Sequence, residues 1–289
     1  MLKAVGAILG VLLLLLVTYG AAIEPRFILN KEDLQTRLPG LGQEWAGAEV
    51  AVFSDLQVGM WWDNDGMIER IVAETVAAEP EAVLLAGDYV YDDEHRLEEK
   101  VATVVELLEP LAETDIPVYA VMGNHDYEVG AVQELTAEFE RMGFEVLSNE
   151  AAPIPSPGTG QGPGLHVVGI GPTQVGEADP AQALSGVPDD APRLVLMHNP
   201  TTFEHLPADS APMSVAGHTH CGQIAIPGLP SWSYLGLNDK EEIVARGLAP
   251  EEFGAPGNDM YVTCGVGFSI VPIRINAAPQ LLMLQLQPA

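Results

Sequence analysis

The chain has 289 residues, of which 47% are hydrophobic and 18% are charged. This composition excludes an intrinsically disordered protein and allows one large domain or two small ones. Its 41 acidic residues against 12 basic ones give a formal net charge of −29, so no nucleic acid binding is expected, because too few cations are present to neutralise phosphates.

The first apolar segment, Ala4 to Ile23, would measure about 30 Å as a helix, which is the thickness of the hydrocarbon core of a bilayer. Its length favours a membrane anchor formed by residues 1–23. The alternative is a signal peptide, because Gly20, Ala21 and Ala22 also fit a cleavage site. Lys3 is the only basic residue before the span, which indicates a domain outside the cytoplasm. We therefore expect a single-pass, extracytoplasmic protein anchored in the membrane, or a secreted one if the segment is cleaved.

A polar connector over 24–47 is expected to lead into one domain over 48–289. In the first half of that domain, 65–78 and 94–113 have apolar residues at three- and four-residue spacing and predict helices. Short apolar runs that end at polar residues predict buried strands at 49–55 (EVAVFSD), 81–88 (EAVLLAGD) and 116–124 (IPVYAVMGN). The alternating order implies an α/β domain with parallel strands and right-handed crossovers.

The second half of the domain predicts further strands at 165–171, 193–199, 212–220, 260–267 and 280–287. The Pro- and Gly-rich segment 152–164 (APIPSPGTGQGPG) predicts an irregular link between the two halves. The stretch 226–258, which contains Trp232 and Tyr234, predicts a loop or lid.

Polar residues with the chemistry of metal ligands follow several predicted strands. Since the carboxyl ends of parallel strands share one edge of a sheet, we expect these residues to meet there. A single histidine or Gly-Asp pair would indicate only a turn or a structural hydrogen bond. Here five such contexts follow one another: SDLQ with Asp55, GDYV with Asp88, GNHD with Asn124 and His125, MHNP with His198, and GHTHCGQ with His218 and His220.

This ordered set resembles the calcineurin-like metallophosphoesterase superfamily, whose pattern is Asp-x-His, Gly-Asp, Gly-Asn-His-Asp/Glu, a lone His and Gly-His-x-His. The sequence IEPRF after the apolar segment and the ending YVTCGVGFSIVPIRINAAPQL are similar to a membrane-anchored bacterial subgroup. The resemblance covers nearly the whole chain from Ala4. It implies a four-layer αββα sandwich, the metallo-dependent phosphatase fold, after a transmembrane helix.

The resemblance also implies two divalent metal ions, which orient a shared hydroxide towards phosphorus. Asp88 would bridge the ions. The second ion would take Asn124, His198 and His218, and the first would take Asp55, His220 and a histidine that is Gln57 here. An amide oxygen suits manganese or magnesium better than zinc or iron, so Mn²⁺ is the expected metal, with Fe or Zn as alternatives. We expect Gln57 to bind the metal through its oxygen. The alternatives, in decreasing order of preference, are that it holds a water molecule at a more open first site or that it marks a lost site.

Other residues have roles only through this resemblance. His125 would donate a hydrogen bond or proton to the phosphoryl or leaving oxygen. Tyr91, followed by Asp92, occupies the place of an aspartate that partners this histidine in some relatives. Arg274 is a candidate for a phosphate contact, but a structural hydrogen-bonding role is at least as well supported.

Two pairs of side chains keep several interpretations. Trp61 and Trp62 could stack on a base or sugar, enter the membrane interface, or cover the core. Cys221 and Cys264 could form a disulfide, although packing as a small buried side chain is the favoured interpretation of Cys221.

The expected function is hydrolysis of a phosphoric ester by a phosphodiesterase or pyrophosphohydrolase. The anchor favours a membrane-proximal and possibly lipid-linked phosphoester substrate. The alternative is a membrane-tethered, non-catalytic binding or scaffold protein in which Gln57 marks a degenerate first metal site.

Overall fold

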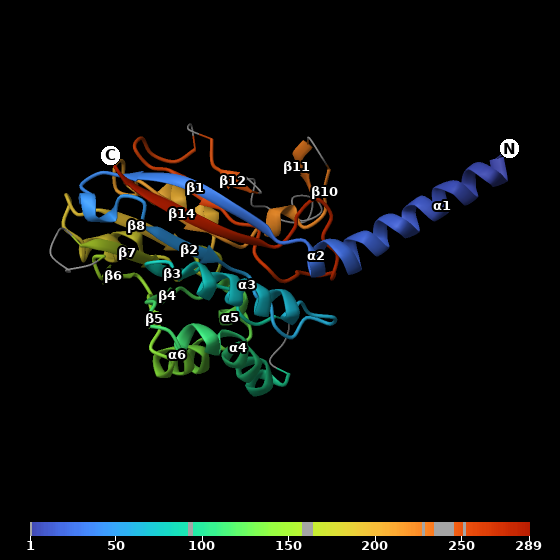
Figure 1. The fold of residues 1–289 in the computed structure, drawn as a ribbon, viewed down its shortest axis with the longest axis horizontal. Coiled ribbons are helices and arrows are strands. Elements are labelled where there is room, and N and C mark those ends of the chain that lie inside the picture. Colours follow the sequence, from blue (N-terminus) through green and yellow to red (C-terminus); the bar gives the residue numbers. More distant parts are fainter. Residues whose placement is uncertain (1, 92–94, 158–163, 227–228, 234–245, 251–252) are drawn as a thin grey trace.

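The computed structural model describes residues 2–91, 95–157, 164–226, 229–233, 246–250 and 253–289. Within these residues, two six-stranded sheets are packed together, with helices on the outer faces (Figure 1). This is the αββα sandwich that the sequence predicts.

The first sheet consists, in spatial order, of β1 (Asn30–Leu38), β14 (Gln280–Pro288), β2 (Glu49–Phe53), β3 (Ala82–Leu85), β4 (Val118–Ala120) and β5 (Glu145–Val146). Strands β2 to β5 are parallel, as predicted for β2, β3 and β4, whereas β14 is antiparallel to β2. Helices α3 (Asp65–Ala78) and α4 (Leu97–Ala112) connect β2, β3 and β4, and α3 has the predicted bounds.

The second sheet consists, in spatial order, of β12 (Gly247–Leu248), β13 (Met260–Val262), β9 (Ser214–Ala216), β8 (Arg193–Met197), β7 (Leu165–Ile170) and β6 (Glu150–Ile154). Its four inner strands are parallel, and the two edge strands are antiparallel to their neighbours. All five strands predicted in the second half of the domain are present.

Side chains of the inner strands alternate between two apolar cores. In β2, Val50 and Val52 face the second sheet, whereas Ala51 and Phe53 face α3 and α4. The same alternation in β8 places every second residue against the layer that includes α7 (Pro180–Ser185). Strands buried on both faces have continuous hydrophobic sequences, which explains why the sequence predicts them well.

Two segments expected to be irregular contribute edge strands instead. Residues 24–47 were expected to be a polar connector, yet β1 pairs along its whole length with β14. Its exposed face is polar, so the sequence NKEDLQTRL lacks an apolar run. The expected link 152–164 begins inside β6, where Pro153 is tolerated because the strand lies at the sheet edge.

Much of the expected loop or lid at 226–258 lies outside the described residues. Residues 227–228, 234–245 and 251–252 are not described, nor is the side chain of Trp232. The expectations for Tyr234 and for the side chain of Trp232 therefore remain predictions. The described part contains a short hairpin of β10 (Ala225–Ile226) and β11 (Leu229–Ser233).

The N-terminal helix projects from the body of the protein (Figure 1). Helix α1 (Leu2–Thr18) continues through a π-helical turn (Tyr19–Ile23) into α2 (Glu24–Phe27). No residue of α1 is buried. By length and composition, the continuous helix Leu2–Phe27 could cross a membrane.

Candidate metal centre

Left-handed turns follow the strands that carry the predicted ligands. The predicted ligands that lie in these turns have φ angles between +47° and +71°, a region that residues with a Cβ adopt at a cost of roughly 1 kcal/mol or more. Surrounding packing must therefore hold the turns in place. The residues are Asp55 and Gln57 after β2, Asp88 after β3, and His218 and His220 after β9.

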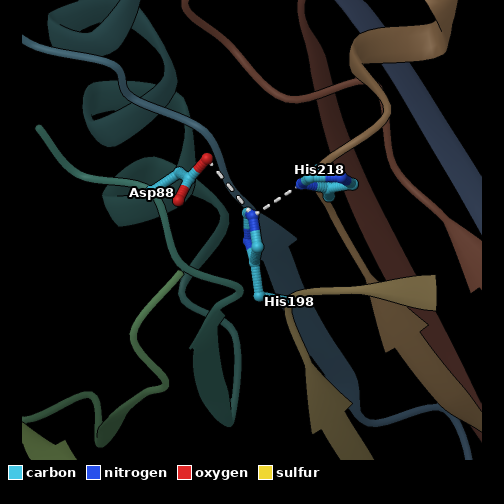
Figure 2. Close-up of side chains that lie close together, drawn as sticks. All are labelled: Asp88, His198 and His218. Carbon is cyan, nitrogen blue, oxygen red and sulfur yellow. Dashed lines mark hydrogen bonds and ion pairs between the residues drawn. The ribbon is translucent and has the colours of Figure 1, made fainter. Parts of the chain in front are cut away.

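Asp88, His198 and His218 form the centre of the cluster (Figure 2). His198 Nε2 lies 3.2 Å from Asp88 Oδ2 and 3.2 Å from His218 Nδ1. The other ring nitrogen of His198, Nδ1, lies 2.7 Å from the backbone oxygen of Ala86 and donates to it. This bond orients the ring so that Nε2 faces Asp88 and can bind a cation once that nitrogen has lost its proton, because a ligating histidine is normally oriented through its second nitrogen.

Gln57 lies between this group and the remaining predicted ligands. Its Nε2 donates to Asp88 Oδ2 at 2.8 Å and lies 3.5 Å from His220 Nε2. His220 Nε2 is in turn 3.5 Å from Asp55 Oδ1. The Oε1 atom of Gln57 is buried and has no hydrogen-bond partner among the described residues. The structure thus brings Asp55, Gln57, Asp88 and His220 together.

Burial and pairing set the charges of these groups. Burial raises the pKa of Asp55 to about 6. Burial would raise the pKa of Asp88, but the charge and hydrogen bond of His198, with smaller contributions from the neighbouring histidines, together hold that pKa well below its usual value. Burial would lower the pKa of His198, yet Asp88 raises it to about 10. Burial lowers the pKa of His218 to about 3, and burial and Arg274 lower that of His220, so both imidazoles are neutral.

These donors fit divalent cations. Carboxylates, an amide oxygen and neutral imidazoles are ligands of manganese, iron and zinc. Asp88, His198 and His218 each offer one ligand atom within 4.8 Å of the others. An unpartnered buried oxygen such as Gln57 Oε1 costs roughly 1–3 kcal/mol, and a cation would satisfy it.

Asn124 is placed beside the cluster by the start of α5 (Asn124–Glu128). It is buried, and its Oδ1 accepts a hydrogen bond from Asn199 Nδ2 at 3.5 Å. Because Asn199 directly follows His198, this contact ties Asn124 to the end of β8.

His125 lies at the solvent side of the same turn. Its backbone N–H donates to Asp88 Oδ1 at 2.9 Å, and its side chain is 23% exposed. The ring centroid lies 5.0 Å from that of Tyr91. Tyr91 is therefore the neighbour of His125 at the place where some relatives have an aspartate, while Asp92 lies outside the described residues.

Asp126, for which the sequence predicts no role, holds the turn of Asp88. Its buried carboxylate accepts backbone N–H groups from Gly123 at 2.8 Å, Asp88 at 3.1 Å, Tyr89 at 2.9 Å and Val90 at 3.2 Å. An acidic residue at the end of the GNHD motif was the available signal in the sequence.

Arg274 supports His220 from behind. The guanidinium donates to the backbone oxygens of Cys264, Gly267 and Ala277, and Nη2 lies 3.3 Å from His220 Nδ1. With 0% of its surface exposed, Arg274 is out of reach of a substrate. These contacts favour the structural interpretation of Arg274.

Cys221 and Cys264 form a disulfide, the pairing that the sequence leaves open, and Cys221 is a small buried side chain, as expected. The bridge joins the turn that carries His220 to the residues that follow β13. The next residue, Gly265, approaches the site so closely that a Cβ there would lie 2.6 Å from the side chain of Asp55. The disulfide therefore ties together two segments that shape the metal centre.

Trp61 and Trp62 are 65% and 54% exposed, so the interpretation in which they cover the core is wrong. The guanidinium of Arg26 lies 4.9 Å from the centroid of the Trp62 ring. Since Arg26 belongs to α2, Trp62 lies against the base of the N-terminal helix.

The chain is similar to known proteins. The model of the calcineurin-like phosphoesterase family matches residues 48–222. The chain is 31% identical over 222 residues to phosphodiesterase YaeI of Escherichia coli, covering 76% of this chain and 75% of that protein. It is 23% identical over 320 residues to UDP-2,3-diacylglucosamine pyrophosphatase LpxG of Chlamydia trachomatis, covering 91% and 90%. A solved dimetal phosphatase from Danio rerio aligns with a TM-score of 0.43 and 12% identity, over 76% and 88% of the chains.

Proposed function

Since the chain belongs to the calcineurin-like phosphoesterase family, and is thus a metal-dependent hydrolase of phosphoric esters, we propose that it cleaves phosphodiester or pyrophosphate bonds near a membrane surface. The observation that carries this proposal is the convergence of Asp88, His198 and His218 from three separate strand ends. The names of the relatives support the choice of bond, because one is a phosphodiesterase and the other a pyrophosphatase.

We assign the ligands of two divalent cations to Asp88 and the residues around it. Asp88 would contact both cations. Asp55, His220 and Gln57 through Oε1 would hold one cation, and Asn124, His198 and His218 the other. When bound, the cations would act as Lewis acids on the phosphoryl group and lower the pKa of a water molecule. Before they bind, the proton on His198 balances Asp88, and a cation would replace that proton.

His125 is the proposed proton or hydrogen-bond donor to the ester. Its backbone is fixed by Asp88, its ring is held against Tyr91, and part of the side chain reaches solvent. A group in this position can contact a phosphoryl or leaving oxygen while the ligands stay buried behind it.

The end of the N-terminal helix supports an uncleaved anchor over a signal peptide. Gly20 is buried, and its backbone oxygen accepts from Arg274 N at 2.8 Å. A Cβ on Gly20 would lie 2.5 Å from Ile275 and 2.9 Å from Ile273. Cleavage after Ala22 would remove a residue that packs into the domain.

The disulfide supports a domain outside the cytoplasm. Disulfides persist in oxidising compartments and are rare in the cytosol. The Cys221–Cys264 bridge is buried, and it agrees with the side of the membrane that Lys3 indicates. A lipid-linked phosphoester substrate fits this location, as the name of the pyrophosphatase relative suggests.

Hydrolysis of two chromogenic esters by the full chain in detergent tests the proposal. With Mn²⁺, bis(p-nitrophenyl) phosphate should be cleaved faster than p-nitrophenyl phosphate. Asp88→Asn and His198→Asn should each lose on the order of 100-fold or more of this activity, because metal-based charge stabilisation contributes several kcal/mol. The matched controls Asp115→Asn and His205→Asn change exposed residues and should stay active. No turnover with any divalent metal would instead favour a binding or scaffold protein.

A further inference from the structure

We propose that exposed apolar side chains beside the metal centre dock on the surface of the bilayer that holds α1. These side chains are Phe27, Trp61, Trp62 and Ile270, with exposures of 71%, 65%, 54% and 48%, and together they form the membrane-facing patch. The inference depends on the proposed membrane anchoring and goes beyond it, because it defines which face of the domain meets lipid.

Arg26 joins the patch to the base of the membrane-spanning helix. Its guanidinium lies 4.9 Å from the centroid of the Trp62 ring and 5.1 Å from that of Phe268. Its Nη2 also donates to the backbone oxygen of Trp62 at 2.7 Å. Arg26 lies in the last turn of the continuous helix Leu2–Phe27. When that helix crosses a bilayer, Trp62 must lie within a side chain's length of the headgroup region.

The composition of the patch suits this depth. Tryptophan is enriched at membrane interfaces because its amphipathic ring suits the headgroup level. With 12 basic against 41 acidic residues, the protein is not drawn to anionic headgroups by its charge. Apolar contact is therefore the attraction that would hold the domain against lipid.

The patch also borders the metal centre. The backbone N–H of Ile270 donates to Tyr91 Oη at 2.9 Å, and the ring of Tyr91 lies against that of His125. Gln223 donates to the backbone oxygens on both sides of Ile270 and fixes this segment to the turn after β9. Docking would turn the His125 side of the site towards the headgroups, where a lipid-linked phosphoester is located.

Quenching of tryptophan fluorescence by brominated lipid tests this placement. The full chain is reconstituted in phosphatidylcholine vesicles with plain or brominated acyl chains, as the wild type and as the double variant Trp61→Phe, Trp62→Phe. Both proteins retain Trp45 and Trp232, so the difference in emission reports Trp61 and Trp62 alone. We expect this difference to be large in plain vesicles and mostly lost in brominated ones. An equal difference in both vesicles would overturn the proposal and indicate water or a protein partner at the patch.

A control places tryptophan on the opposite side of the domain. Glu140→Trp, introduced into the double variant, changes an exposed residue of α6 (Val132–Arg141), which lies far from α1 (Figure 1). Its added emission should not be quenched. Vesicle flotation separates the possible failures. Protein that does not float contradicts the anchor and the patch together, whereas protein that floats with unquenched Trp61 and Trp62 contradicts the patch alone. Hydrolysis of bis(p-nitrophenyl) phosphate in detergent tests the proposed chemistry independently.

Discussion

The imidazole of His198 and the carboxylate of Asp88 lie 3.2 Å apart, although Asp88 follows a strand of the first sheet and His198 a strand of the second. This ion pair is fully buried and joins the two halves of the sandwich. It also occupies the position where a cation would neutralise Asp88. Metal binding and the stability of the sandwich should therefore be linked.

Metal should stabilise the folded protein through this pair. At a Mn²⁺ concentration 100 times the dissociation constant, binding to the folded state alone adds ~2.7 kcal/mol to the free energy of unfolding. For a domain of this size, that gain raises Tm by roughly 5–10 °C. Thermal unfolding with Mn²⁺ and with a chelator measures the shift. Asp88→Asn should abolish it and the exposed-site control Asp115→Asn should keep it; a shift that survives Asp88→Asn would place the metal elsewhere.

Replacing Gln57 by histidine should strengthen the first site. Imidazole is a better ligand than an amide oxygen for zinc, so Gln57→His should tighten binding of the more weakly held Zn²⁺ on the order of tenfold, or ~1.4 kcal/mol. Isothermal titration of the metal-free protein measures this change. Gln182→His adds a histidine at an exposed position and should leave the affinity unaltered. Identical affinities in the wild type and Gln57→His would show that residue 57 does not contact metal.

Asp126 should contribute to stability even without metal. Asp126→Asn replaces an acceptor of four backbone N–H groups with a side chain that has fewer acceptor positions, so buried donors lose partners. We expect the free energy of unfolding of the metal-free protein to fall by about 2–4 kcal/mol. Urea unfolding with a chelator present gives the value. A loss of unfolding free energy no larger than that of the exposed-site control Asp115→Asn would contradict the proposed support of the Asp88 turn.

The disulfide should stabilise the domain and the position of His220. It joins residues 43 positions apart in the sequence, for which the chain-entropy model gives about 4 kcal/mol at 25 °C. The variant Cys221→Ser, Cys264→Ser should unfold at correspondingly lower urea and bind metal more weakly. Adding a reducing agent should reproduce both effects in the wild type and have no effect in the variant. Equal urea midpoints for the oxidised wild type and the double variant would show that the bridge is dispensable for stability.

The sequence predicts the core strands and the meeting of the ligands because both follow from local patterns. Strands buried on two faces are apolar throughout, and parallel strands deliver their terminal residues to one edge. Edge strand β1 escapes prediction because its sequence is mostly polar and its register depends on β14, at the other end of the chain.

Long-range contacts account for the remaining differences. The role of Arg274 depends on backbone oxygens that only the fold brings around it. The placement of Trp62 likewise depends on its contacts with Arg26, which no local pattern encodes. The Cys221–Cys264 pair could be named as a possibility, but spacing alone cannot establish that the two turns meet.

Metal stoichiometry measured together with turnover tests the central claim most directly. Metal-free full-length protein is titrated with Mn²⁺, and bound metal per chain is determined alongside hydrolysis of bis(p-nitrophenyl) phosphate. The account predicts that activity rises to a maximum as the second equivalent binds. Full activity with one equivalent would contradict the dinuclear site, and binding of two equivalents without hydrolysis of any phosphodiester or pyrophosphate would contradict the proposed reaction.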